Sequence, residues 1–261
     1  MAHPLDGPWE KVERAEKHVA DLQAEIQSWH DSEPYRLFAY DDPESGDKIF
    51  AVHVRAYPPA RWGAMLGDVV HNLRAALDLL VYELLRKHDV EPTIQHAFPI
   101  SDSAKEFESG GLRKVKGVGD EAVQLLKAIK PYRGGNDALW ELHQLDRRDK
   151  HRFLVPVGSA YRYLTIDGAE MVKGVPGFSK DLPSLPLNLK PADRLFPVQD
   201  GAELFRIAAA GRDQVDMNPK FTFEIAFGEG EIVEGKPLAE TLQKYVDVTK
   251  GVLQPFRPVF D

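Results

Sequence analysis

The spacing of apolar residues along the chain predicts a helical framework. Between residues 60 and 88, apolar residues recur every three or four positions and cover about a third of a helix circumference. A helix that is apolar over so wide an arc is expected to lie at the centre of a protein. Periodicity and helix-boundary residues predict further helices over residues 8–30, 121–130, 138–152 and 237–254.

Alternating apolar and polar residues predict strands between these helices. Residues 35–40 and 48–55 flank a turn-rich linker, which is typical of a β-hairpin. A proline-rich stretch over 175–198 is predicted to be a loop. Further strands are predicted over residues 153–157, 161–166, 204–209 and 221–227.

Together these elements predict an α+β fold. We expect a helical core in which the long helix 60–88 packs with helix 138–152. A mostly antiparallel sheet is expected to come largely from the C-terminal half. The prediction is a single α+β domain over residues 1–261. If it divides, the expected parts are a helical part with the hairpin, residues 1–155, and a sheet-rich part with the terminal helix, residues 156–261.

Helix 8–30 has a narrow apolar seam. Such a seam is typical of a helix that packs against one partner helix. Packing within the chain is the favoured interpretation, and a homodimer through this helix is the alternative. The seam consists of two sets of residues that repeat every seven positions, Val12, Val19 and Ile26, and Ala15, Leu22 and Trp29.

Charged residues lie on the core-facing side of helix 138–152. Asp146 and Asp149 fall within its apolar arc, and His143 and Lys150 lie just past the edge of that arc. Unpaired buried charge is costly, so these side chains need polar partners inside the protein. The sequence therefore predicts that polar groups converge at this helix.

Helix 60–88 carries a second polar row beside its apolar arc. His71, Arg74 and Asp78 stack along the helix axis, and Tyr82 continues the row. The simplest arrangement packs the two helices together with their polar rows facing. The remaining histidines, among them His53 and His96, are expected to be surface or structural residues.

One interpretation of this cluster is structural. Arg74 and Asp78 form an i,i+4 pair, as do Asp146 and Lys150. A salt-bridge network of this kind can neutralise itself and fix the packing of two helices without any ligand. The protein would then be a non-catalytic binding or interaction protein.

A second interpretation is a metal-independent nuclease or a related acid–base phosphoryl-transfer enzyme. Imidazoles titrate near neutrality, and arginine or lysine can hold a phosphate and stabilise its developing charge. RNA or another phosphate-bearing ligand would be the partner. The candidate catalytic residues are His71, Arg74, Asp78, His143, Asp146, Asp149 and Lys150. The candidate nucleic-acid-binding residues are Arg147, Arg148, His151 and Arg152.

A third interpretation is a metal site formed by His71, Asp78, His143 and Asp146. Two imidazoles and two carboxylates suit zinc, iron or manganese, and helical bundles draw such ligands from facing helices. Arg74 and Lys150, however, would repel a cation. The chain has no known metal-binding or nucleotide-binding motif, so no cofactor is indicated by sequence.

Composition narrows the functional classes further. The chain has no cysteine, which excludes disulfides, thiolate zinc sites and a cysteine nucleophile. A net charge of −8 argues against broad nonspecific binding to nucleic acid, although a local basic patch is compatible with it. No leader-like or membrane-spanning apolar run is evident, so a cytoplasmic location without membrane association is expected.

Three motifs in the first two thirds of the chain carry a resemblance. They are Gly67-Asp68-x-x-His71-Asn72-Leu73-Arg74-x-Ala76-Leu77-Asp78, Phe98-Pro99-Ile100, and Leu145-x-x-x-Asp149-Lys150-His151-Arg152. In these motifs the chain resembles a group of uncharacterised bacterial proteins. The resemblance marks His71, Asn72, Arg74, Asp78, Asp149, Lys150 and His151 as the matching polar positions, and it implies no particular activity.

A fainter resemblance is to the helical HEPN-type domains of toxins and antiphage ribonucleases. Those domains cut RNA without metal and carry an arginine followed, after four to six residues, by a histidine at a helix end. Here Arg147 and His151 have three residues between them. The resemblance implies metal-free RNA cleavage, and the shorter spacing departs from the family pattern.

Overall fold

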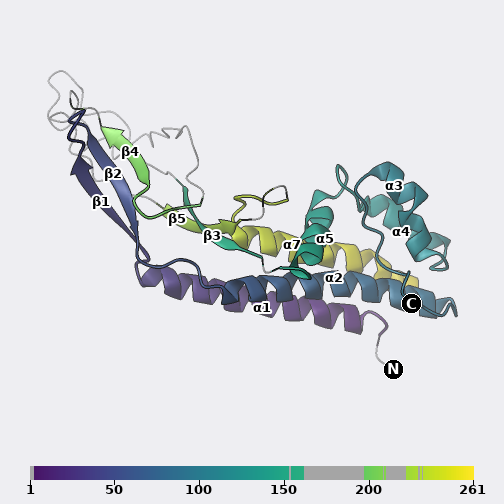
Figure 1. The fold of residues 1–261 in the computed structure, drawn as a ribbon. Coiled ribbons are helices and arrows are strands. Elements are labelled where there is room, and N and C mark those ends of the chain that lie inside the picture. The colour runs from purple at the N-terminus through teal and green to yellow at the C-terminus, as the bar shows by residue number, and fades with distance from the viewer. Residues whose placement is uncertain are drawn as a thin grey trace, which may run out of the picture. The chain divides into compact units, whose positions relative to one another are not determined.

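The computed structural model confirms an α+β fold (Figure 1). It describes residues 3–152, 154–161, 197–207, 209, 222–228, 230 and 232–261. The helices are α1 (Asp6–Asp31), α2 (Arg61–Lys87), α3 (Ala104–Ser109), α4 (Asp120–Ile129), α5 (Asp137–Asp149), α7 (Leu238–Leu253) and α8 (Arg257–Phe260), with short 3₁₀ turns η1 (Gly111–Val115) and η3 (Gln254–Phe256). The strands are β1 (Tyr35–Asp41), β2 (Lys48–Val54), β3 (Pro156–Tyr161), β4 (Glu203–Ile207) and β5 (Thr222–Phe227).

The chain forms two compact units, each built from separate stretches of sequence. The first contains Met1–Glu25, Pro59–Pro156 and Phe227–Asp261, and the second contains Ile26–Pro58 and Val157–Ala226. This division differs from the subdivision at residue 155 that the sequence suggested. The reason is non-local packing, because α7 contacts α2 and α5 whereas the β1–β2 hairpin pairs with β4.

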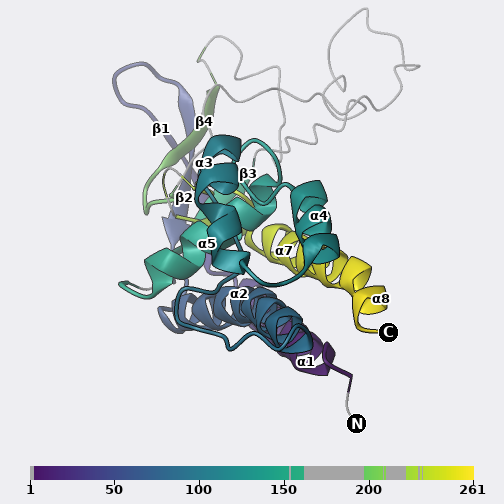
Figure 2. The same cartoon turned by 90° about the vertical axis from the view of Figure 1, so that its right-hand side faces the viewer.

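The core of the first unit forms around α2, which contacts both α5 and α7 (Figure 2). The apolar arc predicted for this helix is fully buried, and so is Leu85 beyond it. At about 25 cal/mol per Å² of apolar surface, such burial is the main source of stability for the unit. The completely buried apolar residues of α2 are Trp62, Leu66, Val69, Val70, Leu73, Ala76, Leu77, Leu80, Val81, Leu84 and Leu85.

The seam of α1 is used within the chain. Over residues 6–25 this helix lies alongside α2 (Figures 1 and 2), and Lys11 Nζ donates to Asn72 Oδ1 at 3.3 Å. At the other end, the Glu25 carboxylate accepts from Trp62 Nε1 at 2.8 Å. The buried seam residues are Val12, Ala15, Val19 and Leu22.

The second unit contains a three-stranded sheet with the order β1-β2-β4 and a two-stranded sheet of β3 and β5. Strands β1 and β2 pair antiparallel from Tyr35↔Val54 to Asp41↔Lys48, as the hairpin prediction requires. Strand β4 pairs antiparallel with β2, with a register shift between Phe50 and Ala51. Of the strand predicted over 161–166 only Tyr161 is described, as the last residue of β3, and most of the loop predicted over 175–198 lies outside the described residues.

Candidate functional site

Helix α5 starts where the sequence predicts and brings its polar row onto α2. The Asn136 side chain accepts from the Leu139 backbone N–H at 3.3 Å and so caps the helix. Near its other end α5 packs very closely on α2, because a Cβ atom at Gly67 would lie 2.4 Å from a carboxylate oxygen of Asp149. Only glycine fits at this position without a shift of Asp149.

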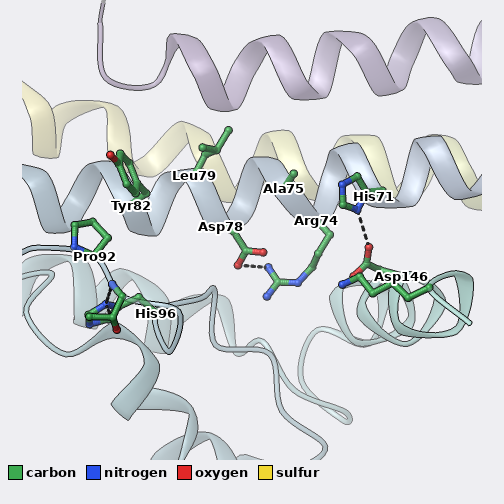
Figure 3. A pocket seen from close by; sticks show the side chains of 11 residues that line it. His71, Arg74, Ala75, Asp78, Leu79, Tyr82, Pro92, His96 and Asp146 are labelled. Carbon is green, nitrogen blue, oxygen red and sulfur yellow. Dashed lines mark hydrogen bonds and ion pairs between the residues drawn. The ribbon is translucent and has the colours of Figure 1, made fainter.

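The two polar rows meet at Asp146. Its carboxylate lies 3.3 Å from His71 Nδ1 through Oδ1 and accepts from Lys150 Nζ through Oδ2 at 2.7 Å (Figure 3). The Asp146 side chain is only 3% exposed, whereas those of His71 and Lys150 are 62% and 57% exposed. A carboxylate only accepts hydrogen bonds, so Nδ1 of the neutral His71 ring carries the proton and Nε2 keeps its lone pair. Asp146 thus orients an accessible base beside a cation.

Arg74 and Asp78 have a different role, since both hydrogen-bond the backbone of Phe98. The buried Arg74 guanidinium donates to the Phe98 carbonyl oxygen at 3.0 Å, and the Phe98 N–H donates to Asp78 Oδ1 at 2.8 Å. Arg74 and Asp78 also pair with each other at 2.8 Å. These contacts hold the segment around Phe98 against α2. This half of the cluster therefore matches the structural interpretation.

The cluster borders a solvent-reaching pocket of about 320 Å³ (Figure 3). Sequence reasoning anticipated the polar members of its lining from α2 and α5. It missed the loop that closes the other side of the pocket, to which Pro92, Thr93 and His96 belong. The lining residues are His71, Arg74, Ala75, Asp78, Leu79, Tyr82, Pro92, Thr93, His96, Asp146 and Lys150.

His143 does not join this pocket. It lines a separate pocket of about 300 Å³, together with Lys114 and Arg147. Its Nδ1 atom is buried and has no hydrogen-bond partner among the described residues. Burial, and then the positive charges of Arg74, Lys114 and Arg147, lower the pKa of His143 to about 4. The ring is therefore neutral at neutral pH.

Asp149 also lies outside the linings of these pockets. Its half-buried carboxylate faces Gly67 of α2. Burial, and then the negative charges of Asp146 and Asp68, raise the pKa of Asp149 above its ordinary value. Asp149 thus contributes to the close packing of the two helices and adds negative charge behind Asp146.

The proposed metal ligands do not come together as a set. His71, Asp78 and Asp146 share the first pocket, while His143 faces the other. The carboxylates of Asp78 and Asp146 are already paired with Arg74 and Lys150. In the described part of the chain, no three histidine, aspartate or glutamate side chains are grouped so that they could hold a metal ion.

The predicted nucleic-acid-binding residues gather in an open groove of about 380 Å³ at the C-terminal end of α5. Within it, Arg148 donates to the Gly230 carbonyl oxygen at 3.3 Å. The groove shares Lys150 with the His71 pocket and Arg147 with the His143 pocket. Its lining consists of Gln144, Arg147, Arg148, Lys150, His151, Arg152 and Ile232.

The described helices give no indication of a membrane segment. None of them is both long enough and apolar enough to cross a bilayer.

The site is formed by side chains of α2 and α5 and by the segment around Phe98, and all of these belong to the first unit.

The three motifs behind the sequence resemblances converge at this site. Gly67 of the first motif faces Asp149 of the third, and Phe98 of the second binds Arg74 and Asp78 of the first. Comparison of the chain with protein-family models, with curated proteins and with solved structures gives no match in any of the three.

Proposed function

We propose that the protein is a metal-independent ribonuclease in which His71 is the general base. The observation that carries this proposal is the buried Asp146 carboxylate, which bonds both His71 and Lys150 where they line the pocket. A base oriented by a buried carboxylate, next to a cation, is an arrangement suited to acid–base catalysis at a phosphate. The faint resemblance to HEPN-type domains favours RNA as the substrate.

The proposed reaction uses the 2′-hydroxyl of RNA as the nucleophile. His71 Nε2 takes the proton of this hydroxyl, the 2′ oxygen attacks the adjacent phosphorus, and the bond between phosphorus and the 5′ oxygen breaks. The departing 5′ oxygen takes a proton from water, and the proton held by His71 neutralises the hydroxide that this leaves. The products are a 2′,3′-cyclic phosphate and a 5′-hydroxyl, and no further co-reactant is consumed.

Asp146 and Lys150 support this step in different ways. Asp146 keeps the His71 ring in the tautomer that exposes Nε2, and it stabilises the imidazolium ion that forms. Lys150 presents an ammonium group to the non-bridging phosphate oxygens, where negative charge develops. The groove that contains Arg147, Arg148 and Arg152 supplies further cations for the flanking phosphates, which offsets locally the net charge of −8.

The test is cleavage of a labelled single-stranded RNA in the presence of EDTA. Wild-type protein is expected to cut it and to leave a cyclic phosphate, whereas a 2′-deoxy analogue stays intact. His71→Gln is expected to lower the rate by about 10²–10⁴-fold, the usual contribution of a general base. Because His71 is 62% exposed, the variant should unfold at the wild-type temperature.

His53→Gln is the matched control. His53 is also an exposed histidine whose Nδ1 bonds an aspartate, here Asp200, but it lies in the second unit. The His53→Gln variant should cut RNA at the wild-type rate. Absence of cleavage by the wild type with EDTA, or full activity of His71→Gln, would contradict the proposal. Cleavage that appears only after divalent metal is added would point to metal-dependent chemistry instead.

A non-catalytic RNA-binding protein is the second candidate. It is favoured by the Arg74–Asp78–Phe98 contacts, which use part of the cluster to hold the fold together. This candidate predicts that RNA binds in the basic groove and emerges uncut. It also predicts that His71→Gln changes neither the binding of RNA nor its integrity.

A further inference from the structure

The pocket that contains His71 has two chemically different ends. The end formed by His71, Asp146 and Lys150 is charged. Figure 3 shows the opposite end, where α2 faces the segment that carries Pro92 and His96. Its lining is mainly apolar and aromatic and consists of Leu79, Tyr82, Pro92, Thr93 and His96, while Arg74, Ala75 and Asp78 lie between the two ends. A phosphate alone would use only the charged end.

Tyr82 presents an aromatic face at the apolar end. It is 43% exposed although it lines a pocket, and the Arg86 guanidinium lies 5.9 Å from its ring centroid. Accessible aromatic rings beside cations are the platforms on which single-stranded nucleic acids stack their bases. Leu79 and Pro92 add apolar surface, which suits the faces of a planar ligand.

His96 adds a hydrogen-bond donor to this end. The Thr93 backbone N–H donates to His96 Nδ1 at 2.9 Å. Nδ1 of the neutral ring is therefore the acceptor, so Nε2 carries the proton. A planar ligand with acceptor atoms on its edge can use this donor, and nucleobases have such an edge.

The volume of the pocket is sufficient for a nucleobase with its sugar. Its volume of about 320 Å³ is at the lower end of the roughly 300–1,000 Å³ typical of small-molecule sites. His71 and Tyr82 are eleven residues apart on α2, which corresponds to about 16 Å along the helix axis. This span is longer than one nucleotide, so a phosphate at the His71 end and a base at the Tyr82 end belong to successive nucleotides of one strand. A base held in a duplex would first have to leave its stack.

We infer that the Tyr82 end of the pocket binds an unpaired nucleobase, so that the site takes single-stranded RNA. This inference rests on the proposed function for the position of the phosphate at the His71 end. It specifies the substrate class of the same site. The base stacks on Tyr82, and Leu79 and Pro92 complete its apolar surroundings.

The test uses NMR titration to compare the binding of adenosine 5′-monophosphate with that of ribose 5-phosphate. Both ligands carry the phosphate, and only the first carries a base. The wild type should bind the nucleotide more tightly by roughly 5- to 150-fold, the range that corresponds to stacking of one base on an aromatic side chain. Tyr82→Ala should remove this difference and leave ribose 5-phosphate binding unchanged.

Two variants serve as controls. Tyr82→Phe keeps the aromatic face and should retain the preference for the nucleotide. Tyr57→Ala removes another exposed tyrosine, 59% accessible and in the second unit, and should behave as the wild type. Equal binding of the two ligands by the wild type, no binding of either, or an unchanged preference in Tyr82→Ala would overturn the inference.

The binding result is separate from the cleavage result. A base preference that depends on Tyr82, in a protein that leaves RNA intact, supports the base site and removes only the ribonuclease proposal. If RNA is cleaved in EDTA and Tyr82→Ala does not change the preference for the nucleotide, the base site is contradicted and the ribonuclease proposal stands. In an active protein, the base site also predicts that duplex RNA is cut more slowly than the same strand unpaired.

Discussion

The two units of this protein each contain an exposed histidine whose Nδ1 bonds an aspartate, and the two pairs differ in the burial of the carboxylate. In the first unit Asp146 is 3% exposed and also bonds Lys150. In the second unit Asp200 is 54% exposed and also accepts from the Val54 backbone N–H at 2.8 Å. Water screens the second carboxylate strongly and the first only weakly. The same pair of residues can therefore orient a base in one place and secure a strand in the other.

The largest effect is expected when each aspartate is replaced in turn. Asp146→Asn offers an amide that can donate to Nδ1, so the ring can place its proton on Nε2 and lose the base. RNA cleavage should fall by about 10³-fold. Asp200→Asn should leave the rate within twofold of the wild type. Equal rates for the two variants would show that burial of the carboxylate does not distinguish the pairs.

The next effect concerns stability and tests the structural half of the cluster. Arg74→Met leaves the Phe98 carbonyl oxygen and the Asp78 carboxylate without their buried partner. The free energy of unfolding should fall by about 2–3 kcal/mol, mainly because the buried Phe98 carbonyl oxygen loses its donor, whereas the 41% exposed Asp78 carboxylate can be hydrated. Arg86→Met removes an exposed arginine whose ion pair with Glu83, at 3.6 Å, lies on the surface of the same helix, and it should barely move the denaturation midpoint. Urea unfolding of both variants measures the difference.

A smaller effect concerns the pH dependence of stability and comes from His143. This residue is half-buried, and its buried Nδ1 has no hydrogen-bond partner among the described residues, whereas His53 and His71 are exposed and each bonds an aspartate. The pKa of His143 is lowered to about 4 by burial and nearby cations. The unfolded chain binds the extra proton between about pH 6.5 and pH 4, so stability is complete above pH 6.5 and falls as the pH drops. At pH 5 this loss is about 2 kcal/mol.

The measurement compares the wild type with His143→Gln at several pH values. The difference in unfolding free energy between the two proteins should change by about 2 kcal/mol between pH 7 and pH 5. A constant difference for His143→Gln would indicate that the ring accepts a proton as readily in the folded as in the unfolded protein.

Local sequence patterns predicted the elements of the fold well. Helix α2 was predicted over 60–88 and spans Arg61–Lys87, and α5 was predicted over 138–152 and spans Asp137–Asp149. The reason is that periodicity and capping residues act within a few positions along the chain. The sequence also predicted that the polar rows of α2 and α5 face each other, because both rows lie beside apolar arcs that must be buried.

Other features of the site depend on contacts between distant segments. His143 and Lys150 lie on the same edge of α5, but they are about 10 Å apart along its axis. Two helices that cross at an angle touch over a limited length, so Lys150 reaches the His71 pocket and His143 faces another. No local pattern contains the crossing angle that separates them.

By itself, the sequence determined which residues form helices, which faces of α2 and α5 are buried, and which polar side chains must find partners. Only the tertiary structure decided how those side chains are divided. In the folded protein, His71 and Lys150 bond the buried Asp146. Arg74 and Asp78 instead bond the backbone of Phe98. His96 lies opposite Tyr82 in the same pocket. The amphipathic pattern of a helix depends on residues a few positions apart in the sequence, whereas a pocket is formed by distant segments that come together only when the chain folds.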